Sequence, residues 1–196
     1  MNAITDRQNE TDSLKKLAAQ RQFYSEAKFL YGLQLFAAGP LAVVLALTAT
    51  IEPEAKKFAA LWSIILLVVN TLIITPLIKK WRTSGATIQE MFDCYVLQIP
   101  WSTIKTGNPI DAEMIAMKAE KLKKRNSKMP TLNDWYSLEV QHLTIDLART
   151  VCQRTNCWWD GHQRRRYASV IAGTAIGLTI ALVIFALIMQ LSLSEL

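Results

Sequence analysis

The chain has 196 residues, of which 51% are hydrophobic, and it carries a formal net charge of +6. Its apolar residues gather in three long runs without a charged side chain, and this distribution excludes an ordinary soluble domain. Because the basic excess follows the membrane orientation argued below, we expect no DNA or RNA partner.

The three uncharged runs begin at Phe29, Phe58 and Tyr167 and extend over 23, 21 and 28 residues. A helix crosses the hydrocarbon core of a bilayer in roughly 20 residues, and a charge at its centre costs about 2.5–3.5 kcal/mol. We therefore predict an all-α membrane protein with three transmembrane helices and a helical cytoplasmic region between the second and the third. The predicted segments are an N-terminal cytoplasmic helix (1–28), the first span (29–51), an external turn (52–57), the second span (58–78), the cytoplasmic helical region (79–166), the third span (167–191) and an external tail (192–196).

Proline marks an irregularity in each of the first two spans. Gly39-Pro40 is predicted to interrupt the first span, and Thr75-Pro76 is predicted to bend the end of the second. Only six residues separate the two runs, so the first two spans should form an antiparallel hairpin.

The orientation follows from lysine and arginine. Five of them lie in residues 1–28, fifteen in residues 79–166 and two in the turn at residues 52–57. Because positively charged loops remain in the cytoplasm, we predict that the N-terminus and residues 79–166 are cytoplasmic.

The region between the second and third spans shows helical periodicity and no strand pattern. Thr87-x-x-Glu90 is a capping-box signature that predicts the start of a helix, which Pro100 should end. Asn108-Pro109 suits the start of the next helix. A further helix is expected to carry Val140, Leu143, Leu147 and Val151.

The stretch "CQRTNCWWDGHQRRRY" (152–167) contains potential metal ligands. Cys152, Cys157 and His162 are spaced by five residues, which on a helix turns neighbours apart by about 140°. We therefore predict no metal site and no cofactor. Trp158 and Trp159 with the following arginines are typical of a chain at the headgroup interface, about to enter the membrane.

A catalytic reading of the cysteines is also weak. Cys94 with His142 could form a nucleophilic pair, but no third group or oxyanion element accompanies them. We predict that the chain is not an enzyme.

Polar and small residues within the spans suggest assembly. If the chain forms a pore, the available lining groups are Gln34, Asn70 and Thr71, although they could instead hydrogen-bond neighbouring spans. A stripe of small residues on the third span favours close approach of a second helix, in a homo-oligomer or within one chain. The stripe consists of Ser169, Gly173, Gly177 and Ala181.

Four segments together resemble the SMODS-associating four-TM effector family. They are "AQRQFYSEAK" (19–28), "FDCYVLQIPW" (92–101), "DWY" (134–136) and "CQRTNCWWD" (152–160), of which the last is the most specific. Its motif residues are Cys152, Gln153, Arg154, Asn156, Cys157, Trp158, Trp159 and Asp160. The family name implies four spans, whereas we expect this chain to end after its third.

The resemblance implies a pore-forming effector without enzymatic activity. Such proteins occur beside bacterial nucleotidyltransferases that make cyclic-oligonucleotide signals, in CBASS-like abortive-infection defence against phage at the inner membrane. The alternative is a non-conducting membrane scaffold or sensor that recruits a partner through its cytoplasmic helices.

If the chain senses the cyclic oligonucleotide directly, its cytoplasmic region must hold the site. Cations would bind the phosphates and aromatic rings would stack on the bases. The candidates are Lys118, Lys121, Lys123, Lys124, Arg125, Tyr95, Trp101, Trp135 and Tyr136. A solvated or lipid-facing basic helix would explain the same cations.

Overall fold

The computed structural model describes residues 2–125 and 132–188, and all regular secondary structure within these ranges is helical. The elements are α1 (Ile4–Gln8), α2 (Thr11–Ala38), α3 (Pro40–Ile51), α4 (Ala55–Val69), the π-helical segment η1 (Asn70–Ile74), α5 (Thr75–Val96), α6 (Thr103–Thr106), α7 (Ala112–Arg125), the 3-10 helix η2 (Leu138–His142) and α8 (Ile145–Ile188). The chain divides into two compact units, Met1–Arg149 and Thr150–Leu196.

Three helical stretches are long and apolar enough to cross a membrane: Thr11–Ile51, Ala55–Val96 and Ile145–Ile188. Their large apolar side chains face outward, as at Phe29, Phe58 and Leu72, which are 65%, 64% and 70% exposed. A soluble protein rarely exposes such surface, whereas lipid covers it. The all-α membrane fold with three spanning helices is thus confirmed. The predicted end of the third span (189–191) and the tail (192–196) lie outside the described residues.

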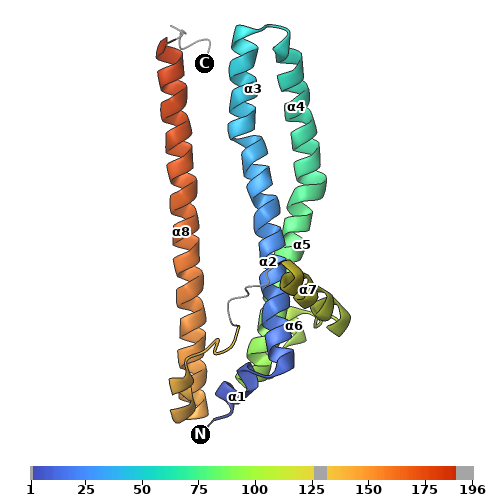
Figure 1. The fold of residues 1–196 in the computed structure, drawn as a ribbon, viewed down its shortest axis with the longest axis vertical. Coiled ribbons are helices and arrows are strands. Elements are labelled where there is room, and N and C mark those ends of the chain that lie inside the picture. The colour runs from blue at the N-terminus through green and yellow to red at the C-terminus, as the bar shows by residue number, and fades with distance from the viewer. Residues whose placement is uncertain (1, 126–131, 189–196) are drawn as a thin grey trace. The chain divides into compact units, whose positions relative to one another are not determined.

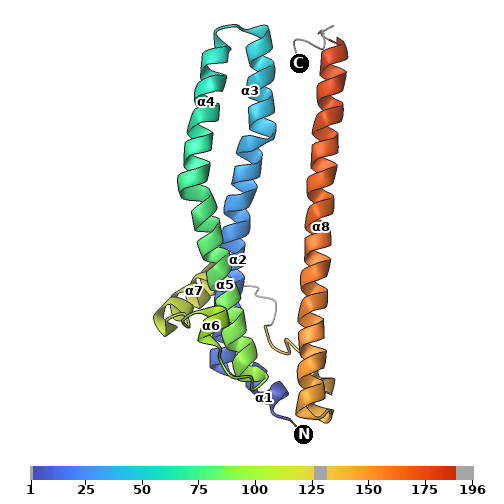
Figure 2. The same ribbon diagram turned by 180° about the vertical axis from the view of Figure 1, so that it is seen from behind.

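The first two spans form an antiparallel hairpin (Figures 1 and 2). The first arm is interrupted at Gly39, between α2 and α3, as Gly39-Pro40 predicted. In the second arm, the irregularity precedes Pro76 and takes the form of the π-helical segment η1. A π-helical segment shifts the register of the following helix, since one turn contains an extra residue.

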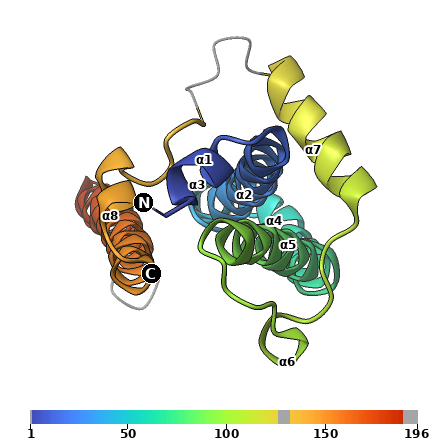
Figure 3. The same ribbon diagram turned by 90° about the horizontal axis from the view of Figure 1, so that it is seen from below.

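Beyond the predicted spans, the same two arms continue into a cluster of helices that we call the helical base. It is defined as residues 2–28, 79–125 and 132–149. Its apolar core joins Ala19 and Phe23 of α2 with Ile88 of α5 and Ile115 of α7. Figure 3 shows α2 and α5 next to each other and nearly end on, with α7 beside α2 and crossing its direction. The spanning helices are therefore direct extensions of the helices that form the base.

Two predicted helix starts are wrong. Thr87 does not cap a helix but is buried within α5, which runs without interruption from Thr75 to Val96. The sequence pattern of a capping box also fits the interior of a helix when the preceding residues stay helical, as residues 82–86 do here. Helix α7 begins at Ala112, later than Asn108-Pro109 predicted.

Two further helix predictions are modified. Helix α5 ends at Val96, ahead of Pro100, and Gln98 adopts a left-handed conformation with φ of 54°. The helix predicted around Val140 and Leu147 is divided into η2 and the first turns of α8, and α8 then continues without a break to Ile188, within the third apolar run.

Candidate functional site

A polar contact joins the two arms of the hairpin within the predicted spans. Gln34 Nε2 of α2 donates a hydrogen bond of 2.6 Å to Asn70 Oδ1, at the first residue of η1. The Thr75 hydroxyl donates to the same oxygen at 3.4 Å. Of the three predicted lining residues, the structure therefore brings Gln34 and Asn70 together, while Thr71 is exposed beside them. Because no water solvates amides in lipid, this mutual bond stabilises the closed hairpin.

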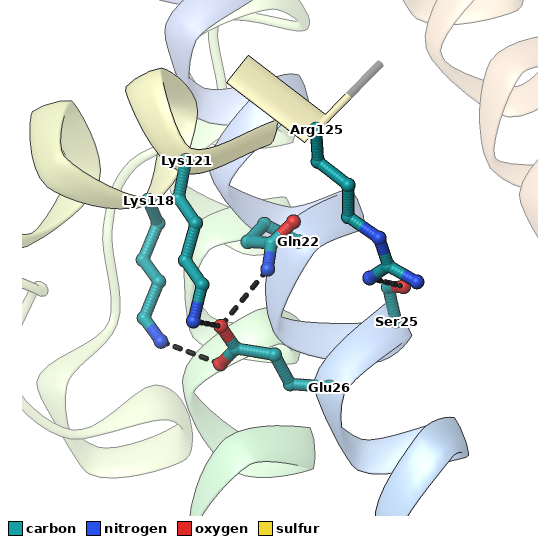
Figure 4. A network of polar contacts seen from close by, with 6 residues as sticks. All are labelled: Gln22, Ser25, Glu26, Lys118, Lys121 and Arg125. Carbon is teal, nitrogen blue, oxygen red and sulfur yellow. Dashed lines mark hydrogen bonds and ion pairs between the residues drawn. The ribbon is translucent and has the colours of Figure 1, made fainter. Parts of the chain in front are cut away.

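The helical base contains a second polar network, centred on Glu26 of α2 (Figure 4). Its carboxylate accepts hydrogen bonds from Lys118 at 2.5 Å, Lys121 at 2.8 Å and Gln22 at 2.9 Å. The side chains of Glu26 and Lys118 are only 10% and 11% exposed. The Lys118 ammonium also lies 4.6 Å from the centre of the Phe23 ring.

The charge state of Glu26 follows from these contacts. Burial by itself raises the pKa of the carboxyl, but hydrogen bonds from Lys118, Lys121 and Gln22 outweigh burial and lower the pKa to about 2. Glu26 is therefore ionised at neutral pH, and it attaches α7 to α2 through two lysines.

A third network connects α1, α5 and the segment before η2. The amide of Gln8 donates to the Tyr136 carbonyl at 3.2 Å and accepts from the Tyr136 backbone N–H at 2.7 Å. The Tyr136 ring stacks on Phe92, and its hydroxyl donates to Asp93 Oδ1 at 2.6 Å. Burial raises the pKa of Asp93 to about 7; the charge of Glu90 also raises it, and the Tyr136 hydrogen bond lowers it.

Arg149 connects the first turns of α8 to the end of α5. Its guanidinium donates to the Leu97 carbonyl at 2.7 Å and to the Gln98 carbonyl at 2.6 Å. These carbonyls follow the helix end and lack intrahelical partners, so Arg149 satisfies them.

The predicted ligand residues are distributed among several contacts. Lys118 and Lys121 meet on Glu26, and Arg125 donates to Ser25 at 2.9 Å. Tyr136 and Trp135 pack on Phe92, Trp101 donates to the Gly107 carbonyl, and Tyr95 lies beneath Arg7 and Lys16. Lys123 and Lys124 are exposed. A shared site for these cations and rings remains a prediction.

The cysteines and histidines do not converge in the described part of the chain, where no group of three or more His, Cys, Asp and Glu side chains could hold a metal ion. Burial and the neighbouring charge of Glu90 raise the pKa of Cys94 to about 11, so its thiol is not an activated nucleophile. Its hydrogen-bond partner is Glu90, whereas His142 contacts Gln141.

Comparison with known proteins identifies the family. The sequence matches the SMODS-associating 4TM effector domain over residues 2–196. The chain belongs to this family. It is also 24% identical over 201 residues to a "Probable CBASS effector molecule" of Bacillus cereus (strain VD146). The aligned region covers 98% of this chain and 65% of the length of that relative. No solved structure matches the chain. The family is described as an effector domain with transmembrane segments, and the description names no enzymatic activity.

Three of the four segments that carry the family resemblance meet in the helical base. The segment 19–28 supplies Glu26, the segment 92–101 supplies Asp93, and the segment 134–136 supplies Tyr136. Glu26 and Asp93 were not among the predicted site residues, although both lie in those segments. Their place within the segments that carry the resemblance was the available signal.

The fourth segment, residues 152–160, lies on α8 and is continuous with the third span. The Trp158 ring stacks on His162 with centroids 5.3 Å apart and contacts Trp159 edge to face at 4.9 Å. Asp160 pairs with Arg164 at 2.7 Å, one helical turn later. Because α8 has no break at Gly161, Cys152, Cys157 and His162 point in different directions.

Proposed function

We propose that this chain is a membrane effector of antiviral defence that permeabilises the bacterial inner membrane in response to a cyclic-oligonucleotide signal. Membership of the effector family and the relative named as a CBASS effector support the defence role. The structural observation that carries the pore proposal is the Gln34–Asn70 hydrogen bond, which pairs two amides within the uncharged part of the hairpin. On activation, the Gln34 and Asn70 amides would break their mutual hydrogen bond and bind water and neighbouring copies of the chain instead. Thr71 would line the path beside them.

The proposal requires a homo-oligomer. Three helices pack around their side chains without a water-filled lumen, so a conducting path needs several copies. The stripe Ser169, Gly173, Gly177 and Ala181 occupies one face of α8 and permits close helix contact in lipid.

Leucine at Gly173 and Gly177 should abolish assembly while preserving insertion. The added side chains separate the helices by several ångströms but keep the span apolar. We expect higher oligomers to disappear in membrane crosslinking, and depolarisation measured with a potential-sensitive dye to fall with them. The matched control replaces Ala172 and Ala175, which lie off the stripe, with leucine. Persistence of oligomers and depolarisation in the Gly173→Leu/Gly177→Leu protein would restrict the stripe to packing within one chain.

Co-expression with a partner nucleotidyltransferase tests the effector role itself. We expect rapid depolarisation only when the active synthase is present, and none with a catalytically inactive synthase. Protection against phage without any depolarisation would instead identify a non-conducting scaffold. In this proposal, the predicted cations and aromatic rings form the site that senses the signal directly. Lys123 and Lys124 are exposed on α7.

The proposal also assigns the segments: residues 1–28 and 79–166 in the cytoplasm, the turn 52–57 outside, and the spans at 29–51, 58–78 and 167–191. Labelling of single-cysteine variants with a membrane-impermeant maleimide tests it. Glu54→Cys should react in intact cells, whereas native Cys157 should react only after permeabilisation. Labelling of Cys157 from outside would reverse the orientation.

A further inference from the structure

A groove lies between the two arms of the hairpin, next to the Gln34–Asn70 hydrogen bond. Its volume is about 400 Å³. It is lined by Tyr31, Gln34, Thr75, Ile78, Lys79, Arg82 and Thr83. The α5 residues of this lining recur at intervals of three and four, so they share one face of the helix. Two of the lining residues, Gln34 and Thr75, hydrogen-bond to Asn70, so the groove adjoins the Gln34–Asn70 contact.

The groove straddles the boundary between apolar and polar sequence. Thr75 and Ile78 belong to the apolar run that ends at Ile78, and Lys79 and Arg82 follow it by one and four residues. This is the depth at which the phosphates of a bilayer lie when the run crosses its hydrocarbon core.

The charge of the groove is positive and locally uncompensated. Its lining contains two cations and no carboxylate. The sequence has no Asp or Glu between Glu26 and Glu52, or between Glu54 and Glu90. Glu26, five residues before Tyr31, is already paired with two lysines of α7. Among the described residues, Lys79 and Arg82 make none of the ion pairs found. The hydroxyls of Thr75 and Thr83 add hydrogen-bonding groups to the same lining.

We propose that this groove binds the phosphate of an anionic phospholipid. A basic pocket between membrane helices at the headgroup level is the arrangement that recognises such lipids. Arg82 supplies a planar fork for phosphate oxygens, and Lys79 supplies a point charge one helical turn away. The bound lipid bridges α2 and α5 next to the Gln34–Asn70 bond and so stabilises the paired arms.

Native mass spectrometry of the detergent-solubilised full chain, titrated with phosphatidylglycerol or phosphatidylcholine, tests this proposal. We expect tighter binding of phosphatidylglycerol. Lys79→Gln and Arg82→Gln should each weaken it about five-fold, the ratio that corresponds to about 1 kcal/mol per cation at an anionic headgroup. The double variant should lose about 25-fold.

The matched control is Lys80→Gln, because Lys80 has the same charge at the same depth but does not line the groove. It should change the affinity less than two-fold, and the charge-preserving Lys79→Arg/Arg82→Lys protein should retain the preference. An equal loss with Lys80→Gln would show diffuse surface attraction and overturn the site. So would an unchanged preference in both single glutamine variants. Displacement of phosphatidylglycerol by a cyclic oligonucleotide, dependent on Arg82, would assign the groove to the soluble signal instead of a lipid.

Discussion

Replacing Glu26 with glutamine should lower the free energy of unfolding of the helical base by about 3 kcal/mol at pH 7. The substitution keeps the side-chain shape but leaves the nearly buried Lys118 ammonium without a counter-charge, and removal of one partner of a buried ion pair costs about 3–5 kcal/mol. The low end applies because Lys121, the second cation, is 60% exposed and can turn to water. Thermal unfolding followed by tryptophan fluorescence is a suitable measurement, since Lys118 lies 5.8 Å from the Trp81 ring centre.

The control for this prediction is Glu120→Gln, which makes the same chemical change at an exposed position of α7 and should shift stability by less than about 0.5 kcal/mol. Combining Glu26→Gln with Lys118→Gln should cost less than the sum of the single changes, because the second substitution removes the uncompensated charge. Strict additivity would mean that the two side chains do not depend on each other. The pKa of Glu26 is lowered from 4.5 to about 2, so its contribution is complete above pH 4.5 and disappears as the pH falls toward 2.

The spans could be predicted from sequence because lipid imposes a one-dimensional rule. A run such as 58–78 must be predominantly apolar and free of charged side chains along its whole length, whatever its neighbours are. Gly39-Pro40 breaks a helix through local backbone constraints alone. Helix irregularities and spans are therefore visible without any knowledge of tertiary contacts.

The polar networks could not be predicted in the same way, since their members are far apart in sequence. Glu26 meets Lys118 across 92 positions, and Gln8 meets Tyr136 across 128. Periodicity identifies the buried face of each helix but not which faces meet. For the same reason the sequence suggested Lys118 and Tyr136 as ligand contacts, whereas the structure shows them bound to Glu26 and Asp93.

Thr87 illustrates a different limit. A Thr-x-x-Glu pattern caps a helix only where the preceding residues leave the helical conformation, and residues 82–86 do not leave it. Gly85 is the weakest helix former among them, yet it is retained where the Tyr24 ring would lie 3.3 Å from an added Cβ. The glycine here serves close packing between α5 and α2, not a helix end.

Stability should fall as the pH rises from 5 to 7, and Asp93→Asn should remove most of this dependence. Burial holds the folded-state pKa of Asp93 at about 7, above the ordinary value of 3.8. Between these values the unfolded chain has released the proton and the folded chain retains it, so each pH unit costs up to about 1.4 kcal/mol. Asparagine is neutral at every pH, and its Oδ1 can still accept the Tyr136 hydroxyl. Because asparagine stands in for the protonated carboxyl, we expect the stability of the variant relative to the wild type to increase by about 3 kcal/mol between pH 5 and pH 8.

Unfolding of both proteins in the same detergent at pH 5, 6, 7 and 8 provides the measurement, and the difference between them cancels titration of the two histidines. Glu113→Gln, at an exposed position of α7, should follow the wild-type profile. Tyr136→Phe tests the same titration by shifting the pKa of Asp93 in a known direction. The hydrogen bond from the Tyr136 hydroxyl lowers this pKa, so its removal should raise the pKa further and extend the fall in stability to higher pH. Parallel profiles for wild type and Asp93→Asn would show that the folded protein holds Asp93 ionised below neutral pH, and that water reaches the Asp93–Tyr136 pair within the helical base.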